Sequence, residues 1–213
     1  MRFIVSTSTL LKQLQAVNGA SSSSTVLPIL ENFLFEIKDN ALTISATDLQ
    51  TSMITSLQVE SKEEGKVAVP AKILIETLKT LPDQPIAFSV DMQTYSIEIS
   101  AGDGKYKLSG ENAEDFPKIP VVENPSTVSI PASVLSEAIN KTIFAVSNDE
   151  LRPAMTGVLC QLTPQSTTFV ATDAHKLVRY RRLDVKSETV TSMILPKKAL
   201  SLLKSSLPSE DVD

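Results

Sequence analysis

The chain contains little of the residue chemistry that small binding and catalytic sites most often use. Its 213 residues include one cysteine, one histidine, no tryptophan and only six glycines. The lone Cys160 excludes an internal disulfide, and we expect it to be a small buried hydrophobic residue on a strand. The histidine and cysteine content is too low for a typical zinc site, and there is no glycine-rich phosphate loop. We therefore expect neither a metal nor a cofactor.

Long hydrophobic runs are also missing from the sequence. No run reaches the roughly 20 apolar residues of a membrane-spanning helix. The leucines near the N-terminus are interrupted by Lys12, Gln13 and Gln15, so they do not form the core of a signal peptide. Together with the single cysteine, this composition predicts a protein of a reducing, cytoplasmic compartment.

Positive charge is in deficit. The sequence has 25 Asp and Glu against 20 Lys and Arg, which gives a formal net charge of -5 at pH 7. Nucleic-acid-binding proteins are usually basic overall, so the sum argues against a generic nucleic-acid binder. It does not exclude a protein that gathers its lysines on one surface. The positions of the charges therefore matter more than their total.

One segment of the sequence occurs twice. Pro28 and Pro153 lie 125 residues apart, and Asp48 and Asp173 have the same separation. A repeat of this length has the size of a domain and is far longer than the roughly 20–50 residues of a solenoid repeat. The sequence therefore predicts a duplicated domain.

The repeat extends further along the chain. Pro70 and Pro196 match with a separation of 126 residues, which places a one-residue insertion in a loop of the second copy. After Pro82 the first copy continues with more alternating apolar residues, whereas the second copy has almost no chain left before Asp213. We therefore expect the second copy to be incomplete.

Hydrophobic periodicity predicts an α+β fold with mainly antiparallel sheet. In the first copy the predicted elements are strand 3–5, helix 10–17, a hairpin of strands 33–37 and 42–46, strands 53–59 and 66–69, helix 70–81, and strands 86–90, 95–100 and 105–108. In the second copy they are strand 128–130, helix 131–145, strands 158–162, 168–172, 176–180 and 190–195, and helix 196–207. A proline-rich linker over 117–126 separates the copies.

Lysines occupy the sides of two predicted helices that lie opposite the leucines. In helix 70–81, Lys72 and Lys79 share one side, and in helix 196–207, Lys197 and Lys204 repeat the spacing. Lysines arranged in this way can reach the phosphates of a nucleic acid without reading its sequence. A solvated helix face is the alternative, and Glu76 between the first two lysines favours it.

The only histidine, His175, lies two residues after Asp173. A hydrolase that uses the two residues as an acid–base pair is one hypothesis, although a triad would need a nucleophile that the sequence cannot place. The other is that Asp173 bonds nearby backbone N–H groups in a turn. Asp48 occupies the equivalent position of the first copy without a histidine, and this favours the structural role.

Short motifs along the whole chain carry a resemblance to one known family. They are Met1-Arg2-Phe3, Leu27-Pro28-Ile29-Leu30, Ala46-Thr47-Asp48-Leu49, Val69-Pro70-Ala71, Asp115-Phe116-Pro117, Leu151-Arg152-Pro153, Ala171-Thr172-Asp173-Ala174-His175-Lys176-Leu177 and Pro196-Lys197-Lys198. In this order they resemble the bacterial DNA polymerase III beta subunit, the DNA sliding clamp.

The resemblance implies a non-enzymatic processivity factor. Each subunit of the family has three similar domains of two helices packed on antiparallel sheet, and two subunits form a ring around duplex DNA. The ring tethers the replicative polymerase, and its helices line the hole. On this basis residues 1–122 are clamp domain one, residues 123–213 are an incomplete domain two, and the third domain is absent.

The resemblance also implies which side chains face double-stranded DNA. They are Lys12, Lys72, Lys79, Arg152, Lys197 and Lys198. Two positions depart from the family's pattern and weaken the expected contact locally. Ser24 replaces an arginine that often touches DNA, and Asp149 replaces a glutamine found in some members.

Two protein interfaces follow from the same resemblance. The pocket that receives linear motifs of the DNA polymerase III alpha subunit and the clamp loader is expected to involve Met155, Thr172, Ala174, His175, Lys176 and Leu177. The homodimer contact is expected on an edge strand that carries Lys105, Tyr106 and Leu108. A two-unit protein-interaction module without a DNA role remains the alternative to the clamp.

Overall fold

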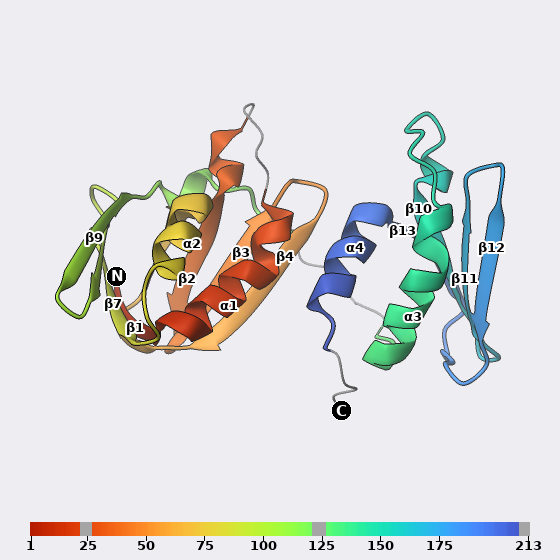
Figure 1. The fold of residues 1–213 in the computed structure, drawn as a ribbon, viewed down its shortest axis with the longest axis horizontal. Helices are drawn as coiled ribbons and strands as arrows, with labels where there is room; N and C mark the ends of the chain where they lie inside the picture. The colour runs from red at the N-terminus through yellow and green to blue at the C-terminus, as the bar shows by residue number, and fades with distance from the viewer. Residues whose placement is uncertain (22–26, 121–126, 209–213) are drawn as a thin grey trace. The chain divides into compact units, whose positions relative to one another are not determined.

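A computed structural model describes residues 1–21, 27–120 and 127–208 of the chain (Figure 1). The chain divides into two compact units, Met1–Pro120 and Val121–Asp213. Each unit combines two α-helices with antiparallel sheet, so the predicted α+β fold is confirmed. Ser24 and the predicted boundary between residues 122 and 123 lie outside the described residues.

The first sheet of unit one has the strand order β4-β3-β2-β6. Its strands are β2 (Asn32–Lys38), β3 (Ala41–Thr47), β4 (Ser52–Gln58) and β6 (Gly65–Pro70). The predicted hairpin joins β2 to β3 through Asp39 and Asn40, whose φ angles are 51° and 60°. A two-residue hairpin turn needs such left-handed residues, and Asp and Asn tolerate this conformation better than most side chains.

The second sheet of unit one has the order β5-β1-β7-β8-β9. Its strands are β1 (Arg2–Ser6), β5 (Glu60–Glu63), β7 (Pro85–Val90), β8 (Ser96–Ala101) and β9 (Gly104–Ser109). The sequence analysis missed β5, because its four residues are polar and show no apolar alternation. It forms a strand by pairing with β1 at the edge of the sheet.

Helix α1 (Thr7–Val17) begins three residues before the predicted helix 10–17 and ends at the same residue. The Ser6 hydroxyl accepts the backbone N–H of Thr9 at 3.5 Å. The Asp83 carboxylate accepts both the Ser6 hydroxyl at 2.8 Å and the Ser8 N–H at 3.1 Å. Side-chain acceptors therefore satisfy N–H groups that have no partner within the first turn of the helix.

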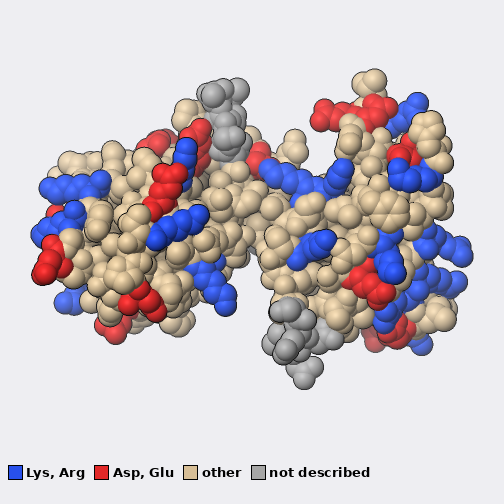
Figure 2. Space-filling model, viewed as in Figure 1, with Lys and Arg blue, Asp and Glu red and all other residues tan. Residues whose placement is uncertain are grey.

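Helix α2 (Ala71–Lys79) follows Pro70, which is the last residue of β6 and caps the helix. The predicted helix began one residue earlier and ended two residues later. Leu74 and Leu78 are fully buried, so the leucine side of the helix faces the core as predicted. On the side viewed in Figure 2, basic and acidic side chains both lie over the helices.

Unit two contains one sheet within its described residues, with the order β12-β11-β10-β13. Its elements are α3 (Ala132–Thr142), β10 (Gly157–Leu162), β11 (Thr167–Thr172), β12 (Leu177–Arg182), β13 (Thr191–Pro196) and α4 (Lys197–Ser206). Both helices and all four strands agree with the predicted elements to within a few residues. The core lies between this sheet and the two helices.

The two units repeat each other residue by residue. In unit one, β3 pairs with β4 through Thr47 opposite Ser52, and in unit two β11 pairs with β12 through Thr172 opposite Leu177. Both members of the second pair lie 125 residues after those of the first. The repeated proline motifs also match, because Pro28–Glu31 and Pro153–Met155 each form a 3-10 turn opened by proline. The predicted duplication is therefore present in the strand register.

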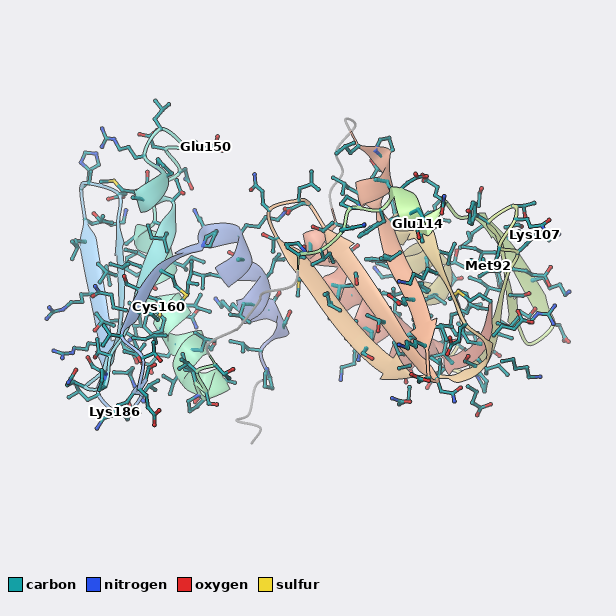
Figure 3. The ribbon with its side chains drawn as sticks, turned by 180° about the vertical axis from the view of Figure 1, so that it is seen from behind. Met92, Lys107, Glu114, Glu150, Cys160 and Lys186 are labelled. Atoms are coloured by element: carbon teal, nitrogen blue, oxygen red, sulfur yellow. The ribbon has the colours of Figure 1, made fainter. Side chains whose placement is uncertain are left out.

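Cys160 lies in the core of unit two, beside the buried Ile139, Phe169 and Leu200 (Figure 3). Burial raises the pKa of its thiol, so the reactive thiolate form is disfavoured. The prediction of a small buried hydrophobic residue on a strand is confirmed.

The predicted strand over residues 128–130 is wrong. These residues form no strand, and Val128 only packs against the edge of the core. In unit one the equivalent strand β1 is held between β5 and β7. No strand of the described part of unit two pairs with residues 128–130, and an unpaired segment cannot form the inter-strand hydrogen bonds of a sheet.

None of the helices in the described ranges is long and apolar enough to cross a membrane.

Candidate functional site

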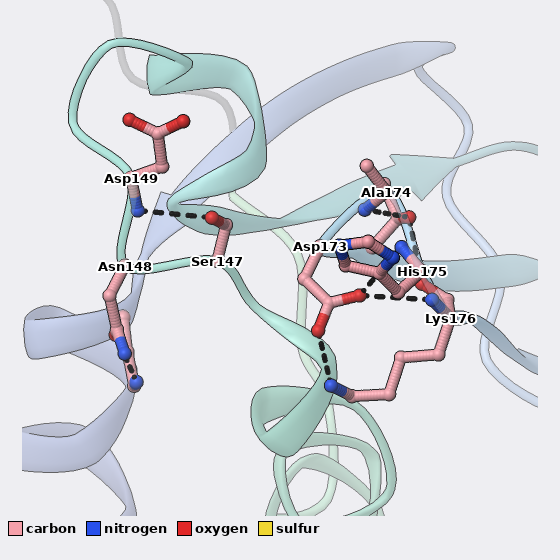
Figure 4. A network of polar contacts seen from close by, with 9 residues as sticks. Ser147, Asn148, Asp149, Asp173, Ala174, His175 and Lys176 are labelled. Carbon is pink, nitrogen blue, oxygen red and sulfur yellow. Dashed lines mark hydrogen bonds and ion pairs between the residues drawn. The ribbon is translucent and has the colours of Figure 1, made fainter.

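The turn between β11 and β12 holds three of the six residues that the resemblance assigns to a partner pocket, and two more, Thr172 and Leu177, flank it (Figure 4). The carboxylate of Asp173 accepts the backbone N–H groups of His175 at 3.0 Å and of Lys176 at 2.9 Å. The Thr172 hydroxyl accepts the N–H of Ala174 at 3.2 Å, and Ala174 adopts a φ of 74°. This tight network fixes the backbone from which the exposed His175 side chain projects.

The equivalent turn of unit one has the same bonds. Asp48 accepts the N–H groups of Gln50 at 2.9 Å and of Thr51 at 2.6 Å. The Thr47 hydroxyl accepts the N–H of Leu49 at 3.1 Å, and the φ of Leu49 is 73°. Unit one has no histidine at this turn, and its aspartate makes the same hydrogen bonds to the backbone. The aspartate therefore stabilises the turn in both units, and its predicted structural role is confirmed.

The ammonium group of Lys176 also bonds the Asp173 carboxylate. This hydrogen bond, followed by the backbone bonds of the turn, holds the pKa of Asp173 well below its ordinary value. The carboxylate is therefore ionised and engaged by Lys176 and by two backbone groups. No bond from the His175 ring to Asp173 is formed, so the structure provides no support for an acid–base pair or a hydrolase.

A polar hollow of about 530 Å³ lies beside this turn in unit two. It is lined by Phe144, Val146, Ser147, Asn148, Asp149, Arg152, Asp173, His175, Lys176 and Lys197. Two residues expected to face DNA, Arg152 and Lys197, therefore share one hollow with two expected to face a protein partner, His175 and Lys176.

The cations in the hollow have fixed partners. Arg152 forms an ion pair with Asp149 at 3.6 Å, and Lys197 donates to the Asn148 side-chain oxygen at 2.8 Å. Asp149 lies where the family resemblance led us to expect a weaker DNA contact, and its carboxylate partly neutralises Arg152. Both contacts come from the loop that precedes the repeated proline turn, so this loop sets the position of two expected DNA-facing cations.

Four of the expected pocket residues lie outside the hollow. Thr172 ends β11, Ala174 is in the turn, and Leu177 begins β12 with 67% of its surface exposed. Met155 ends the 3-10 turn and is half-buried, and its carbonyl accepts the N–H of Ser147 at 2.8 Å. The structure thus brings His175 and Lys176 into the hollow and leaves the apolar Leu177 beside it.

The remaining DNA-facing candidates are exposed on helices. Lys12 lies on α1, Lys72 and Lys79 lie on α2, and Lys198 lies in the first turn of α4. Their exposure agrees with the predicted polar helix faces. Their role in DNA binding stays a prediction.

The residues expected at a subunit interface lie on β9, which is an edge strand of its sheet as expected. Lys105 forms an ion pair with Glu98 of β8 at 3.0 Å. Tyr106 and Leu108 are half-buried and lie on the opposite face of the strand. The strand therefore offers an unpaired backbone edge, and the interface itself stays a prediction.

Four residues of the hollow were missed by the sequence analysis, namely Phe144, Val146, Ser147 and Asn148. Phe144 is 61% exposed, although its position after the apolar face of α3 suggests burial. Asn148 lies within the polar run of residues 147–150, and what distinguishes it is its contact with Lys197, 49 residues away in the sequence. Neither of these two residues could be recognised from local pattern. Within the described ranges, no cluster of three or more His, Cys, Asp or Glu could hold a metal ion.

Two family models match consecutive parts of the chain. The DNA polymerase III beta subunit, N-terminal domain, matches residues 1–120, and the central domain of the same subunit matches residues 129–213. The chain belongs to the DNA polymerase III beta subunit family. The resemblance inferred from the motifs is therefore confirmed.

Relatives in this family are called beta sliding clamps. The chain is 30% identical over 222 residues to that of Staphylococcus epidermidis, covering 100% of the chain and 58% of the relative. It is 30% identical over 206 residues to that of Vibrio cholerae, covering 96% of the chain and 56% of the relative.

Solved structures of the family agree with the fold. The crystal structure of the DNA polymerase sliding clamp from Bacillus subtilis matches with a TM-score of 0.94 and 27% identity, over 100% of the chain and 58% of that clamp. The DNA polymerase III subunit beta from Pseudomonas aeruginosa matches with a TM-score of 0.89 and 30% identity, over 100% and 58%. The chain thus spans less than two thirds of the length of these relatives.

Proposed function

We propose that this chain acts in a DNA sliding clamp, which encircles duplex DNA and tethers the replicative polymerase. The observation that carries the proposal is the match of both units, over the whole chain, to solved sliding clamps with a TM-score of 0.94. On this proposal residues 1–122 and 123–213 belong to clamp domains one and two. The protein is a non-catalytic scaffold of DNA replication in the cytoplasm.

Double-stranded DNA is the proposed ligand of the helix lysines. Lys12, Lys72 and Lys79 on unit one and Lys198 on unit two are exposed, and Lys197 is half-buried. All five are suited to phosphate contacts that carry no sequence information. Arg152 joins them from the loop beside the hollow. The net charge of -5 agrees with this use of lysine, because a sliding ring needs contacts to phosphate on one surface and not an overall positive charge.

Protein partners are proposed for the turn of unit two. The DNA polymerase III alpha subunit and the clamp loader would insert linear motifs beside His175, Lys176 and Leu177, together with Met155, Thr172 and Ala174. The exposed apolar side chain of Leu177 next to a rigid, hydrogen-bonded turn supports this use. Homodimerisation would use the free edge of β9 with Lys105, Tyr106 and Leu108.

Charge reversal at the start of α4 tests the DNA contact. The double variant Lys197→Glu, Lys198→Glu of the intact protein is expected to bind circular duplex DNA more weakly, whatever the DNA sequence. Each lost phosphate contact should also reduce the slope of log affinity against log salt by about one. Fluorescence anisotropy or gel retention over a salt series measures both effects.

A matched control reverses two exposed lysines that no proposed contact uses, Lys38→Glu with Lys186→Glu. This control changes the net charge equally and is expected to keep the salt slope of the parent. If the Lys197 and Lys198 variant binds DNA with unchanged affinity and slope, the DNA proposal is wrong. The two-unit interaction module would then account better for the fold.

A further inference from the structure

A row of exposed side chains lies on one face of β12 (Leu177–Arg182). Strand residues alternate between the two faces of a sheet. Val178 and Tyr180 pack against the core of unit two, so their neighbours Leu177, Arg179 and Arg181 point away from the helices. All three of these are exposed. We call Leu177, Arg179 and Arg181 the β12 row.

No carboxylate lies beside the β12 row on the sheet. The residues opposite it on β11 are Thr172, Val170 and Thr168, and those next on the same face are Leu159 and Gln161 of β10 and Ile194 and Ser192 of β13. None of these side chains is acidic. On this sheet face of the described chain, Arg179 and Arg181 are therefore the only charged side chains.

The arginines of the row differ from their neighbour on the opposite face. Arg182 is bound by Asp184 at 2.6 Å and by Glu137 at 3.3 Å. Among the described residues, no ion pair involves Arg179 or Arg181. Arg181 instead donates its Nε to the hydroxyl of the buried Ser166 at 3.0 Å, which holds the guanidinium in place and leaves its outer N–H groups available.

Unit one shows that the fold does not require these cations. Counting back 125 residues places Ile54 at the position of Arg179 and Ser56 at that of Arg181, on β4. The same sheet face of unit one has two lysines on its strands, Lys66, which is paired with Glu36 at 2.9 Å, and Lys38 at the end of β2. The equivalent strand of unit one forms without arginines, so the sheet does not need Arg179 and Arg181 in order to form.

We propose that the β12 row binds an acidic, extended segment of a protein partner. Alternate residues of a strand are about 7 Å apart, and alternate residues of an extended peptide have the same spacing. Two carboxylates at alternate positions of such a segment therefore meet Arg179 and Arg181, and each guanidinium can hold a carboxylate through two hydrogen bonds. Leu177 lies at the head of the row and joins it to the proposed pocket for linear motifs.

The inference rests on the proposed function in taking the partner to be a protein. It adds to that function a preference for acidic residues in the segment that leaves the pocket. A nucleic-acid strand fits the row less well, because strand-binding surfaces combine cations with aromatic side chains on which bases stack. The described part of this sheet face has no aromatic side chain, since Tyr180 and Phe169 point to the core.

Peptide binding to the 213-residue chain tests the proposal. The probe is a fluorescein-labelled peptide of alternating Thr and Asp, and its control has Asn in place of each Asp. We expect the chain to bind the Asp peptide and not the Asn peptide, with anisotropy as the readout. Exchanging both arginines for the unit-one residues, Arg179→Ile with Arg181→Ser, should weaken binding about tenfold, since each exposed pair contributes a factor of a few.

Two further variants make the result specific. Arg179→Lys with Arg181→Lys keeps the charge and loses the two-bond geometry, so its affinity should lie between those of the parent and the Ile/Ser variant. Lys38→Ser with Lys186→Ser removes the same net charge elsewhere and should bind like the parent. Circular dichroism checks that each variant folds.

Three outcomes would overturn the inference. The first is equal affinity of the Ile/Ser variant and the parent for the Asp peptide, and the second is equal binding of the Asp and Asn peptides by the parent. The third is that the parent binds a thymidine oligonucleotide more tightly than the Asp peptide and that the Ile/Ser variant loses this binding. The duplex-DNA assay on the Ile/Ser variant separates this inference from the clamp proposal. We expect unchanged DNA association there, so failure of the DNA proposal and failure of the acidic-peptide proposal give different results.

Discussion

Replacing Gly157 by alanine is expected to destabilise unit two and to leave unit one unchanged. Gly157 is the buried first residue of β10 and pairs with Pro196 at the end of β13. A Cβ atom at this position would lie 2.5 Å from the carbonyl oxygen of Leu195 and 2.7 Å from a methyl carbon of Ile194. The first contact is with backbone, so no change of rotamer can relieve it.

The size of the effect follows from this crowding. Forcing an extra carbon into a well-packed site typically costs 1–3 kcal/mol, so we expect a loss of about 2 kcal/mol in the free energy of unfolding of unit two. For a unit of this size, each 1 kcal/mol lowers the melting temperature by about 4–8 °C, which gives a decrease of about 8–16 °C. The displaced β13 leads directly into α4, so the bond from Lys197 to Asn148 should also lengthen.

Hydrogen exchange followed by mass spectrometry measures this effect in each unit separately. Amides of β10 and β13 should exchange about 30-fold faster in the variant, which is the factor that corresponds to about 2 kcal/mol. The equivalent strands β2 and β6 of unit one serve as an internal reference and should keep their rates. Gly104→Ala is the matched control, because its nearest neighbours would be 3.3 Å away and one of them is the movable ring of Tyr106.

The result that would refute the reasoning is protection of β10 and β13 in Gly157→Ala equal to that of the parent. It would mean that the two strands can separate at no cost, and that the close approach does not hold α4 and Lys197 in position. Equal loss of protection in both units would contradict their treatment as separately stabilised units.

Two further predictions concern the repeated turn. Asp173→Ala should abolish binding of partner peptides to unit two, because the N–H groups of His175 and Lys176 lose their acceptor. Asp48→Ala should leave that binding unchanged. Peptide titrations compare the two variants, and equal effects would contradict a local role for the turn. The pKa of the Asp173 carboxylate lies below its ordinary value of 3.8. An aspartate of the unfolded chain therefore protonates at a higher pH than Asp173 does in the folded protein. The turn should stay formed at the pH where the unfolded aspartate protonates and should loosen only as the pH falls further. The amide shifts of His175 and Lys176 in an NMR titration report this, and a midpoint at or above 3.8 would contradict the assignment.

Most of the fold follows from local pattern in the sequence. The leucine spacing located α1 and α2, and period-two alternation located the hairpin of β2 and β3 together with its Asp39-Asn40 turn. The role of Asp48 and Asp173 was also predictable, because an aspartate reaches backbone N–H groups two and three residues further along the chain. These interactions lie within a few residues, so the sequence contains both partners side by side.

The errors occurred where an element depends on a distant partner. The polar β5 is a strand because β1 pairs with it, and residues 128–130 resemble β1 in sequence and yet lack such neighbours. The candidate site shows the same limit. Family resemblance supplied Arg152, Lys197 and His175, but it assigned them to two separate functions and did not indicate that they line one hollow.

The sequence by itself determined the duplication, the α+β class and the family, because a period of 125 residues and a set of ordered motifs need no three-dimensional information. Only the tertiary structure decided which cations have partners. It paired Lys197 with Asn148, 49 residues away in the sequence, and it left Arg179 and Arg181 on a sheet face without acids. The physical reason is that an ion pair acts over a few ångströms in space, and the residues that meet at that distance are chosen by strand pairing and helix packing rather than by sequence separation.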